Sequence, residues 1–215
     1  MQRLRIRFSR GEEIKYISHL DLMRLWQRAL NRANIALAYS EGFSPHPRVS
    51  LALPLALGVT SEAELMDIVL EKFVSPHSFT AAVGRQLPSG VTISGVFNTP
   101  LKLPSLQSQV RQAEYTVAIP TDKKKIEIES SLNSLLDKDS LPWEHRRDTG
   151  PHKYDLRALI DDLWLIDWRE GLCNIGMLLR CDSTGSGRPE QVAIALGFEK
   201  YPESIHRKKL ILKTN

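Results

Sequence analysis

The segment from Tyr39 to Ser50 contains the residue types best suited to chemistry in this chain. It places Glu41, Ser44, His46 and Arg48 within eight positions, and a proline stands on each side of the histidine. Each proline fixes its own φ and restricts the residue before it, so the segment should hold its side chains in place. An imidazole there could act as a general acid or base, a metal ligand or a phosphate contact. A loop histidine that simply bonds a backbone carbonyl is the structural alternative.

Arg48 is the best candidate for an anion contact in this segment. A guanidinium on a rigid turn can pair with phosphate or carboxylate through two hydrogen bonds, although an internal ion pair with Glu41 or Glu62 would explain it equally well. His19 is a second candidate for acid–base chemistry, because the dipole at a helix N-terminus favours a neutral imidazole. We expect His19 and Glu62 to converge on Glu41, His46 and Arg48.

The basic residues are unevenly distributed, although the formal net charge is only +4. Residues 1–32 carry eight basic and three acidic side chains, a local net charge of +5, and a second basic cluster follows His206. Such stripes are typical of proteins that bind nucleic acids, but solvated lysines and arginines look the same in a sequence. The side chains expected on phosphates are Arg5, Arg7, Arg24, Arg28 and Arg48.

Other classes of chemistry find little support. The two cysteines, Cys173 and Cys181, are too few for a disulfide framework and lack the spacing of a zinc knuckle. His19, His46 and His77 are far apart in the sequence, so neither a metal site nor a cofactor is predicted for this chain. No apolar run reaches the ~18 residues of a membrane span, and the arginine-rich N-terminus lacks the apolar core of a signal peptide. A cytoplasmic location without membrane contact is expected.

The N-terminal half follows a β-α-β-β-α-β order. Apolar residues alternate with arginines over residues 4–8, as in a half-buried strand, and Ser18 is the predicted N-cap of a helix with apolar residues at helical spacing. Ser75 followed by Pro76 indicates the start of a second helix. The six elements are predicted, in this order, at residues 4–8, 18–33, 49–57, 63–73, 75–87 and 91–97.

The C-terminal half repeats this order after a linker at residues 99–113, which contain two prolines and no sustained period. The fold class is therefore predicted as α+β, with two ferredoxin-like (β-α-β-β-α-β) antiparallel sandwiches in tandem, at residues 1–98 and 114–215. Asp155, Arg157 and Arg188 form a second polar cluster in the C-terminal domain. The elements of this half are predicted at residues 115–119, 121–136, 143–147, 163–168, 174–181, 188–197 and 210–212.

Five segments of this chain form a recognisable set of motifs, at residues 16–22, 39–48, 55–62, 154–157 and 187–190. Through them the chain resembles the radical SAM-linked protein family of bacteria, a domain of unknown function encoded beside or fused to radical SAM proteins. Ser44 stands where asparagine is expected in many of those relatives. The resemblance implies a radical SAM protein as partner and a role in RNA-related or ribosome-related chemistry. It also implies that the iron–sulfur cluster and S-adenosylmethionine belong to the partner only.

Three functions are compatible with these observations. The first is an accessory module that binds RNA or another anionic substrate through a basic face and presents it to a radical SAM enzyme. The second is a self-sufficient RNA-processing or RNA-modifying enzyme, with His19 or His46 as its acid or base. The third is a protein-interaction adaptor without RNA binding. Whether the chain is catalytic stays open, and a module that is not catalytic alone is the preferred reading.

Overall fold

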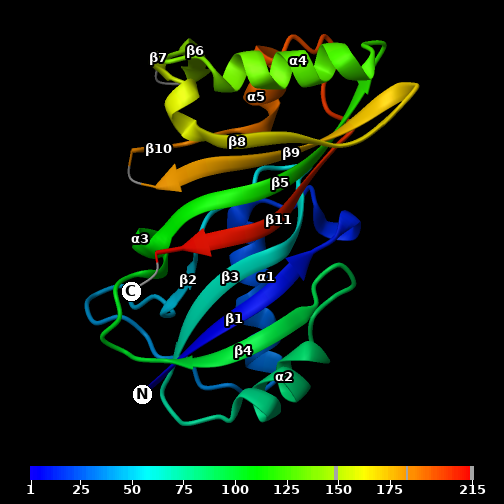
Figure 1. Ribbon diagram of the computed structural model, residues 1–215. Helices are drawn as coiled ribbons and strands as arrows, with labels where there is room; N and C mark the ends of the chain where they lie inside the picture. Colours follow the sequence, from blue (N-terminus) through cyan, green and yellow to red (C-terminus); the bar gives the residue numbers. More distant parts are fainter. Residues whose placement is uncertain (148–149, 183, 214–215) are drawn as a thin grey trace. The chain divides into compact units, whose positions relative to one another are not determined.

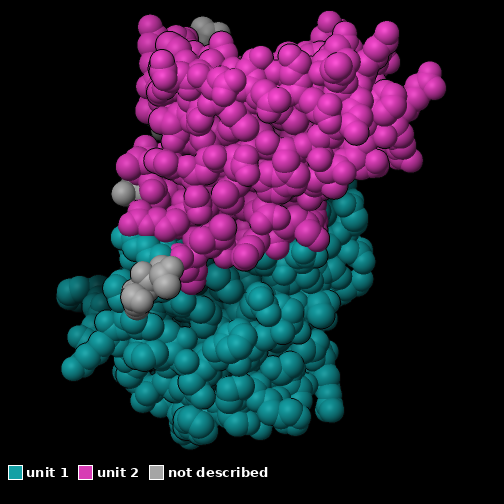
Figure 2. All heavy atoms as spheres, in the orientation of Figure 1, with its two compact units in different colours: residues 1–110, 213–215 teal, residues 111–212 magenta. Residues whose placement is uncertain are grey.

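The computed structural model describes residues 1–147, 150–182 and 184–213 (Figure 1). These residues form a mixed α/β structure with five α-helices. The chain divides into two compact units (Figure 2). Unit 1 takes in residues 1–110 and Lys213, and unit 2 takes in residues 111–212.

Unit 1 is built on a four-stranded antiparallel sheet in the order β2-β3-β1-β4. Two α-helices cover one face of this sheet (Figure 1). The unit also contains a short helix, α3, and the 3₁₀ turn η1, whose Ile14 belongs to the same core. The elements are β1 (Gln2–Arg10), η1 (Glu12–Ile14), α1 (His19–Arg32), β2 (Val49–Leu51), β3 (Thr60–Leu70), α2 (Pro76–Gly84), β4 (Ile93–Thr99) and α3 (Leu106–Gln109).

Apolar residues and arginines alternate along β1, and the apolar residues mark the face of the sheet that borders the core. Leu4, Ile6 and Phe8 are fully buried and pack with the apolar sides of α1 and α2. Phe8 meets Trp26 of α1 edge-on, with ring centroids 4.9 Å apart. Because successive side chains on a strand point to opposite faces, Arg3, Arg5 and Arg7 lie on the face away from these helices.

Helix α1 begins and ends where its sequence indicates. The Ser18 hydroxyl accepts a hydrogen bond from the backbone N–H of Asp21 at 3.1 Å and donates one to the Asp21 carboxylate at 2.7 Å. This local network confirms the predicted N-cap. The helix ends just before Asn34, which has a positive φ of 54°.

Unit 2 has a sheet in the order β11-β5-β9, with β8 and β10 both pairing with the remaining edge of β9. A separate two-stranded hairpin, β6–β7, stands outside this sheet. The elements are β5 (Val110–Thr121), α4 (Lys125–Leu136), β6 (Pro142–Arg147), β7 (Gly150–Asp155), η2 (Arg157–Leu159), β8 (Ile160–Arg169), β9 (Gly171–Asp182), β10 (Gly185–Ser186), α5 (Pro189–Ala195) and β11 (Ser204–Leu212).

Several local predictions are confirmed and others are corrected. The predicted hairpin around Gly171 is β8–β9, and the predicted helix with Pro189 at its first position is α5. The extended segment 49–57 contains only three strand residues, and the strand predicted at 63–73 runs three residues earlier. Lys124, rather than Thr121 or Asp122, is the N-cap of α4. The strand predicted at 143–147 pairs with the unpredicted β7 instead of joining the main sheet.

None of the described helices is long and apolar enough to cross a membrane.

Candidate anion-binding site

The loop that contains His46 is closed at its base by backbone hydrogen bonds. The Ser40 N–H donates to the His46 carbonyl at 2.9 Å, and the Arg48 N–H donates to the Ala38 carbonyl at 2.8 Å. The Ser40 hydroxyl accepts the His46 N–H at 3.0 Å. These bonds fix the two ends of the loop, while residues 41–46 are exposed. Gly42 supplies the one positive φ in this segment, 121°.

The same loop borders a pocket of unit 1 with a volume of about 390 Å³, called here the Arg48 pocket. The floor is the face of the sheet that the two large helices leave uncovered, and residues 101–105 form another wall. The polar residues that line the pocket are Arg3, Ser40, His46, Arg48, Ser50, Asp67 and Ser105.

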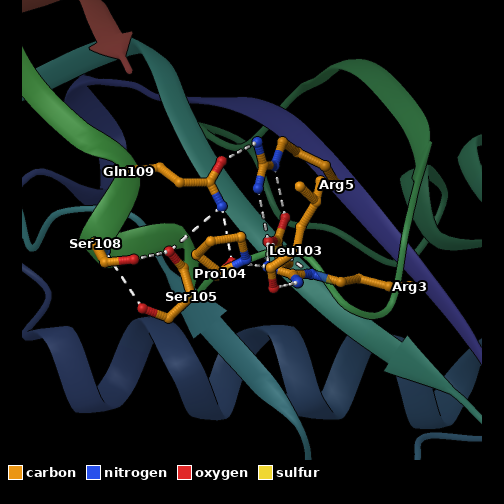
Figure 3. A network of polar contacts seen from close by, with 8 residues as sticks. Arg3, Arg5, Leu103, Pro104, Ser105, Ser108 and Gln109 are labelled. Atoms are coloured by element: carbon orange, nitrogen blue, oxygen red, sulfur yellow. Dashed lines mark hydrogen bonds and ion pairs between the residues drawn. The ribbon is translucent and has the colours of Figure 1, made fainter. Parts of the chain in front are cut away.

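Two arginines share a single carboxylate at the floor of the Arg48 pocket (Figure 3). The Arg3 Nη2 atom lies 2.6 Å from Asp67 Oδ2, and the Arg5 Nε atom lies 2.8 Å from Asp67 Oδ1. The carboxylate is only 3% exposed, so solvent screens these contacts weakly. Two guanidinium groups against one carboxylate leave one positive charge at the floor.

Backbone and amide groups hold both guanidinium groups in place. Arg3 also donates to the carbonyls of Leu103 at 2.7 Å and Pro104 at 3.0 Å. Arg5 donates to the Gln109 side-chain carbonyl at 3.3 Å, and the Gln109 amide donates in turn to the Pro104 carbonyl at 2.8 Å (Figure 3). The network therefore ties β1 and β3 to the segment before α3 and fixes the floor of the pocket.

Arg48 has an exposed guanidinium that forms no ion pair with any described residue. Its one side-chain contact joins Nη1 to the Met1 sulfur at 3.7 Å. In particular, it does not pair with Glu41 or Glu62, the internal partners considered from the sequence. Arg48 and His46 therefore border the same pocket with their polar groups available to a ligand.

The other candidates of the N-terminal half are distributed more widely. Glu41 and Ser44 are exposed at the tip of the loop and do not line the pocket. Glu62 belongs to the end of β3 that pairs with Arg10, whereas the loop joins β3 near Ile68. At about 3.3 Å per residue, that separation along the strand is roughly 20 Å. The structure brings His46 and Arg48 together but does not bring Glu62 to them.

His19 is exposed at the first position of α1. The Arg10 guanidinium donates to the carbonyls of Lys15 and Ile17, at 2.9 Å and 2.6 Å, so the start of α1 lies at the Arg10 end of β1. That is the end where β1 pairs with Ser61. His19 is therefore on the Glu62 side of unit 1, away from the His46 loop.

The arginines expected on phosphates occupy both sides of the unit 1 sheet. Arg5 and Arg7 lie on the face away from the helices, and Arg7 is exposed. Arg24 and Arg28 are exposed on α1, which covers the opposite face. Arg24 also contacts the Asp21 carboxylate at 3.2 Å. The five residues consequently do not share one face, and Arg7 and Arg48 are the exposed arginines away from the helical layer.

The polar cluster expected in the C-terminal half is divided between two roles. Asp155 and Arg188 line a pocket of unit 2 with a volume of about 360 Å³, called here the hairpin pocket. Hydrogen bonds from the backbone N–H groups of Leu141 and Arg157, at 2.8 Å and 2.9 Å, hold the pKa of the Asp155 carboxyl below its usual value. The Arg157 guanidinium is a structural brace that donates to the carbonyls of Leu136 and Ile160.

Three further residues of the hairpin pocket were missed from the sequence. His145 lies on β6, and His152 and Tyr154 lie on β7. A signal for them exists, because rings recur at alternate positions in Trp143-Glu-His145 and again in His152-Lys-Tyr154, on either side of a turn-forming glycine. This is the period of a hairpin with one aromatic face.

The two cysteines are buried and unsuited to nucleophilic chemistry. Burial raises the pKa of the Cys173 thiol to about 11 and that of Cys181 to about 12. Because the thiolate is the reactive form, both side chains are inert near neutral pH. Among the described residues, no group of three His, Cys, Asp or Glu side chains is placed to hold a metal ion.

Comparison with known proteins gives a family and a fold. The family described as an uncharacterized protein conserved in bacteria (DUF2344) matches residues 3–189. No curated protein sequence matches the chain. A chain of the Cbf5–Nop10–Gar1 complex is similar in structure, with a TM-score of 0.55 and 8% identity over 96% of this chain and 48% of that one. A chain of an H/ACA RNP bound to a substrate RNA containing 2′-deoxyuridine gives a TM-score of 0.49 and 9% identity over 95% and 46%. This chain spans about half the length of those it matches, and the likeness is one of fold.

Proposed function

The chain belongs to the bacterial DUF2344 family, and we propose that it binds the phosphate backbone of RNA through the Arg48 pocket of unit 1. The observation that carries this proposal is the unpaired Arg48 guanidinium at a pocket whose floor holds two guanidinium groups on one carboxylate. A phosphate oxygen is the group that such a guanidinium would pair with through two hydrogen bonds.

The distribution of charge supports unit 1 as the RNA-binding part. Residues 1–110 carry twelve basic and eight acidic side chains, which account for the whole net charge of +4. Residues 111–215 carry seventeen of each sign. A positive excess raises the local concentration of a polyanion and speeds its association, and Arg7 adds an exposed cation on the side of the sheet that Arg5 occupies. His46, at the rim of the pocket, can donate a further hydrogen bond to a phosphate oxygen.

We also propose the finer fold assignment on which this function rests. The order β4-β1-β3-β2 in unit 1, with one helix in each crossover, fits a ferredoxin-like sandwich. In unit 2 the order β11-β5-β9-β8 fits the same plan, with the β6–β7 hairpin inserted before β8. Function resides in sites and not in this scaffold, so the RNA assignment comes from the pocket.

The accessory role is proposed on the resemblance to radical SAM-linked proteins. In this role the chain presents RNA to a radical SAM enzyme, and the iron–sulfur cluster and S-adenosylmethionine belong to that partner. Co-purification from native cells, with and without ribonuclease treatment, tests it. Retention of a radical SAM protein together with RNA supports the accessory role, whereas retention of the protein but no RNA supports the adaptor.

Arg48→Ala tests RNA binding directly. We expect the affinity for a fluorescent 20-nucleotide single-stranded RNA to fall on the order of tenfold at low salt, because one charge-assisted contact is lost. The slope of log K against log salt should become shallower by about 0.7, the value for one phosphate contact on a single strand. Fluorescence anisotropy between 50 and 300 mM salt measures both.

Arg85→Ala is the matched control for this experiment. Arg85 is an exposed arginine at the end of α2, on the helical side of unit 1, so its removal changes the net charge equally. It should leave the affinity within about twofold of the wild-type value. Equal losses in both variants would indicate a diffuse charge effect and would refute the Arg48 pocket as the site.

A further inference from the structure

The β6–β7 hairpin presents an aromatic face to the hairpin pocket of unit 2. Trp143 is paired across the hairpin with Tyr154, and His145 is paired with His152. Side chains of directly opposed residues project to the same face of an antiparallel pair, and so do residues two apart on one strand. All four rings therefore share one face, and three of them line the pocket.

Two contacts fix this aromatic face against the opposite wall of the pocket. The Tyr154 hydroxyl is hydrogen-bonded to the Gln191 side-chain carbonyl of α5. The Arg188 Nη1 atom lies 3.2 Å from His145 Nε2. The hairpin is thus joined to the segment around α5 at two points, with the pocket between them.

His152 and Tyr154 form a platform for a planar ring. Their rings are stacked with centroids 5.6 Å apart and an interplanar angle of 26°. Tyr154 is half-buried and His152 is exposed, so His152 is the member of the pair that solvent reaches more readily. Exposed aromatic rings in a pocket are the groups on which nucleobases stack in single-stranded RNA complexes.

The two arginines of the hairpin pocket differ in whether they have an ion-pair partner. Arg180 is occupied by an ion pair with Asp161 at 2.7 Å. Arg188, in contrast, forms no ion pair with any described residue, and its guanidinium lies within hydrogen-bonding distance of the His145 imidazole. The Asp155 carboxylate already accepts hydrogen bonds from the backbone N–H groups of Leu141, Arg157 and Ala158 and from Ser140, and these bonds lower its pKa. The pocket therefore offers a cation without a counterion and a stacking surface.

We propose that the hairpin pocket binds a nucleoside monophosphate unit, with the base stacked on His152 and the phosphate on Arg188. Its volume of about 360 Å³ lies within the range of roughly 300 to 1,000 Å³ typical of small-molecule sites. Free nucleotides and the nucleotides of an RNA strand share this chemistry. The site lies in unit 2 and does not rest on the function proposed for the Arg48 pocket.

The test is a set of calorimetric titrations of the full chain with AMP, GMP, CMP and UMP, and with the matching nucleosides. At least one monophosphate should bind about tenfold more tightly than its nucleoside, because the phosphate adds a charge-assisted contact. In Arg188→Ala this ratio should fall to about one. His152→Ala should weaken the nucleotide and the nucleoside alike by about tenfold, whereas His152→Phe, which retains a stacking ring, should stay within about threefold of wild type.

One control variant makes the outcome specific to this pocket. Arg169→Ala removes an exposed arginine of unit 2 that does not line the pocket and should bind as wild type does. The nucleotide affinity of Arg188→Ala and the RNA affinity of Arg48→Ala are separate measurements, so failure of the Arg48 pocket as an RNA site would leave the Arg188 result unchanged. A 5′-phosphorylated hexanucleotide distinguishes the sources: tighter binding than any monophosphate indicates a strand, and weaker binding indicates a free nucleotide.

The proposal is overturned if neither a monophosphate nor the hexanucleotide binds at millimolar concentration. It is also overturned if the His152→Ala and Arg188→Ala variants bind as tightly as wild type, or if free tryptophan or tyrosine saturates the pocket in place of every nucleotide.

Discussion

Asp67 is a buried carboxylate of unit 1 that is shared by two arginines. It is buried beneath two guanidinium groups, and each of them also depends on it for a partner. The sequence showed Arg5 as a basic residue of an alternating strand but could not show this pairing, because Asp67 is 62 positions away. The pairing arises from strand register, in which Arg5 stands opposite Asp67 across β1 and β3.

Asp67→Asn should therefore destabilise the fold strongly. An amide of the same shape leaves two largely buried guanidinium groups without their counterion, so we expect the free energy of unfolding to fall by about 3 kcal/mol. Urea denaturation followed by circular dichroism measures this change. Glu129→Gln removes an exposed carboxylate 3.8 Å from Lys125 and should cost no more than about 0.5 kcal/mol. Similar losses in both variants would contradict the account of Asp67.

The candidate site was predictable at the level of one loop and no further. The prolines around His46 and the guanidinium of Arg48 are local features, and the structure places both residues at one pocket. The wider convergence depends on which end of β3 each segment meets, and that is a property of the whole sheet. Local sequence patterns contain no such information, so Glu62 and His19 were expected where the register does not put them.

At the scale of elements, the predictions at Ser18, Pro189 and Gly171 are confirmed, because each residue acts through a single backbone requirement that is visible in the sequence. The N-cap of α4 was predicted at Thr121 or Asp122 and lies at Lys124. The β6–β7 hairpin was missed because only one of its strands was recognised. Its partner strand contains Pro151, which lowers strand propensity, although a proline is tolerated in a two-stranded sheet where one edge has no neighbour.

The β8–β9 hairpin depends on a close approach of a ring to a backbone. Gly176 stands opposite Trp164, and a Cβ atom on Gly176 would lie 2.0 Å from Trp164 Cε2. Gly176→Ala should lower the free energy of unfolding by about 1 to 3 kcal/mol, since the indole must leave its place on the strand. In the Trp164→Leu background the same change should cost less than about 0.5 kcal/mol. Thermal unfolding of wild type, Gly176→Ala, Trp164→Leu and the double variant gives a double-mutant cycle. If the two single effects simply add, Gly176 and Trp164 do not interact and the predicted clash is wrong.

At the scale of the whole molecule, acid should weaken the fold through several carboxylates. In the folded chain hydrogen bonds lower the pKa of each of them, chiefly from the Ser18 hydroxyl for Asp21, the Leu141 N–H for Asp155 and the Thr184 hydroxyl for Asp182. The unfolded chain then takes up protons at a higher pH than the folded chain. The stability that these groups contribute is complete above their ordinary pKa, 3.8, and is lost as the pH falls through their lowered folded values.

Urea titrations at pH 7, 5, 4 and 3 should show this loss as a fall in the free energy of unfolding. Between pH 7 and 5 these carboxylates should change that free energy little. Asp155→Asn should be less stable than wild type at pH 7 and should lose less stability between pH 5 and 3. Asp137→Asn, an exposed aspartate at the end of α4, should follow the wild-type profile. Parallel profiles for wild type and Asp155→Asn would show that Asp155 titrates alike in the folded and unfolded chains.

The closed base of the His46 loop separates the tip of the loop from the rest of the fold. Hydrogen bonds at Ser40, His46 and Arg48 join the two ends of the loop, so residues 41–45 project from a completed frame. Phe43 at their centre is fully exposed and packs against nothing in the fold. The exposed positions other than Gly42, whose φ of 121° favours glycine, can therefore vary with little effect on stability, as the hypervariable loops of a binding scaffold do. Specificity could diverge between relatives at this tip while the pocket beneath it keeps its chemistry.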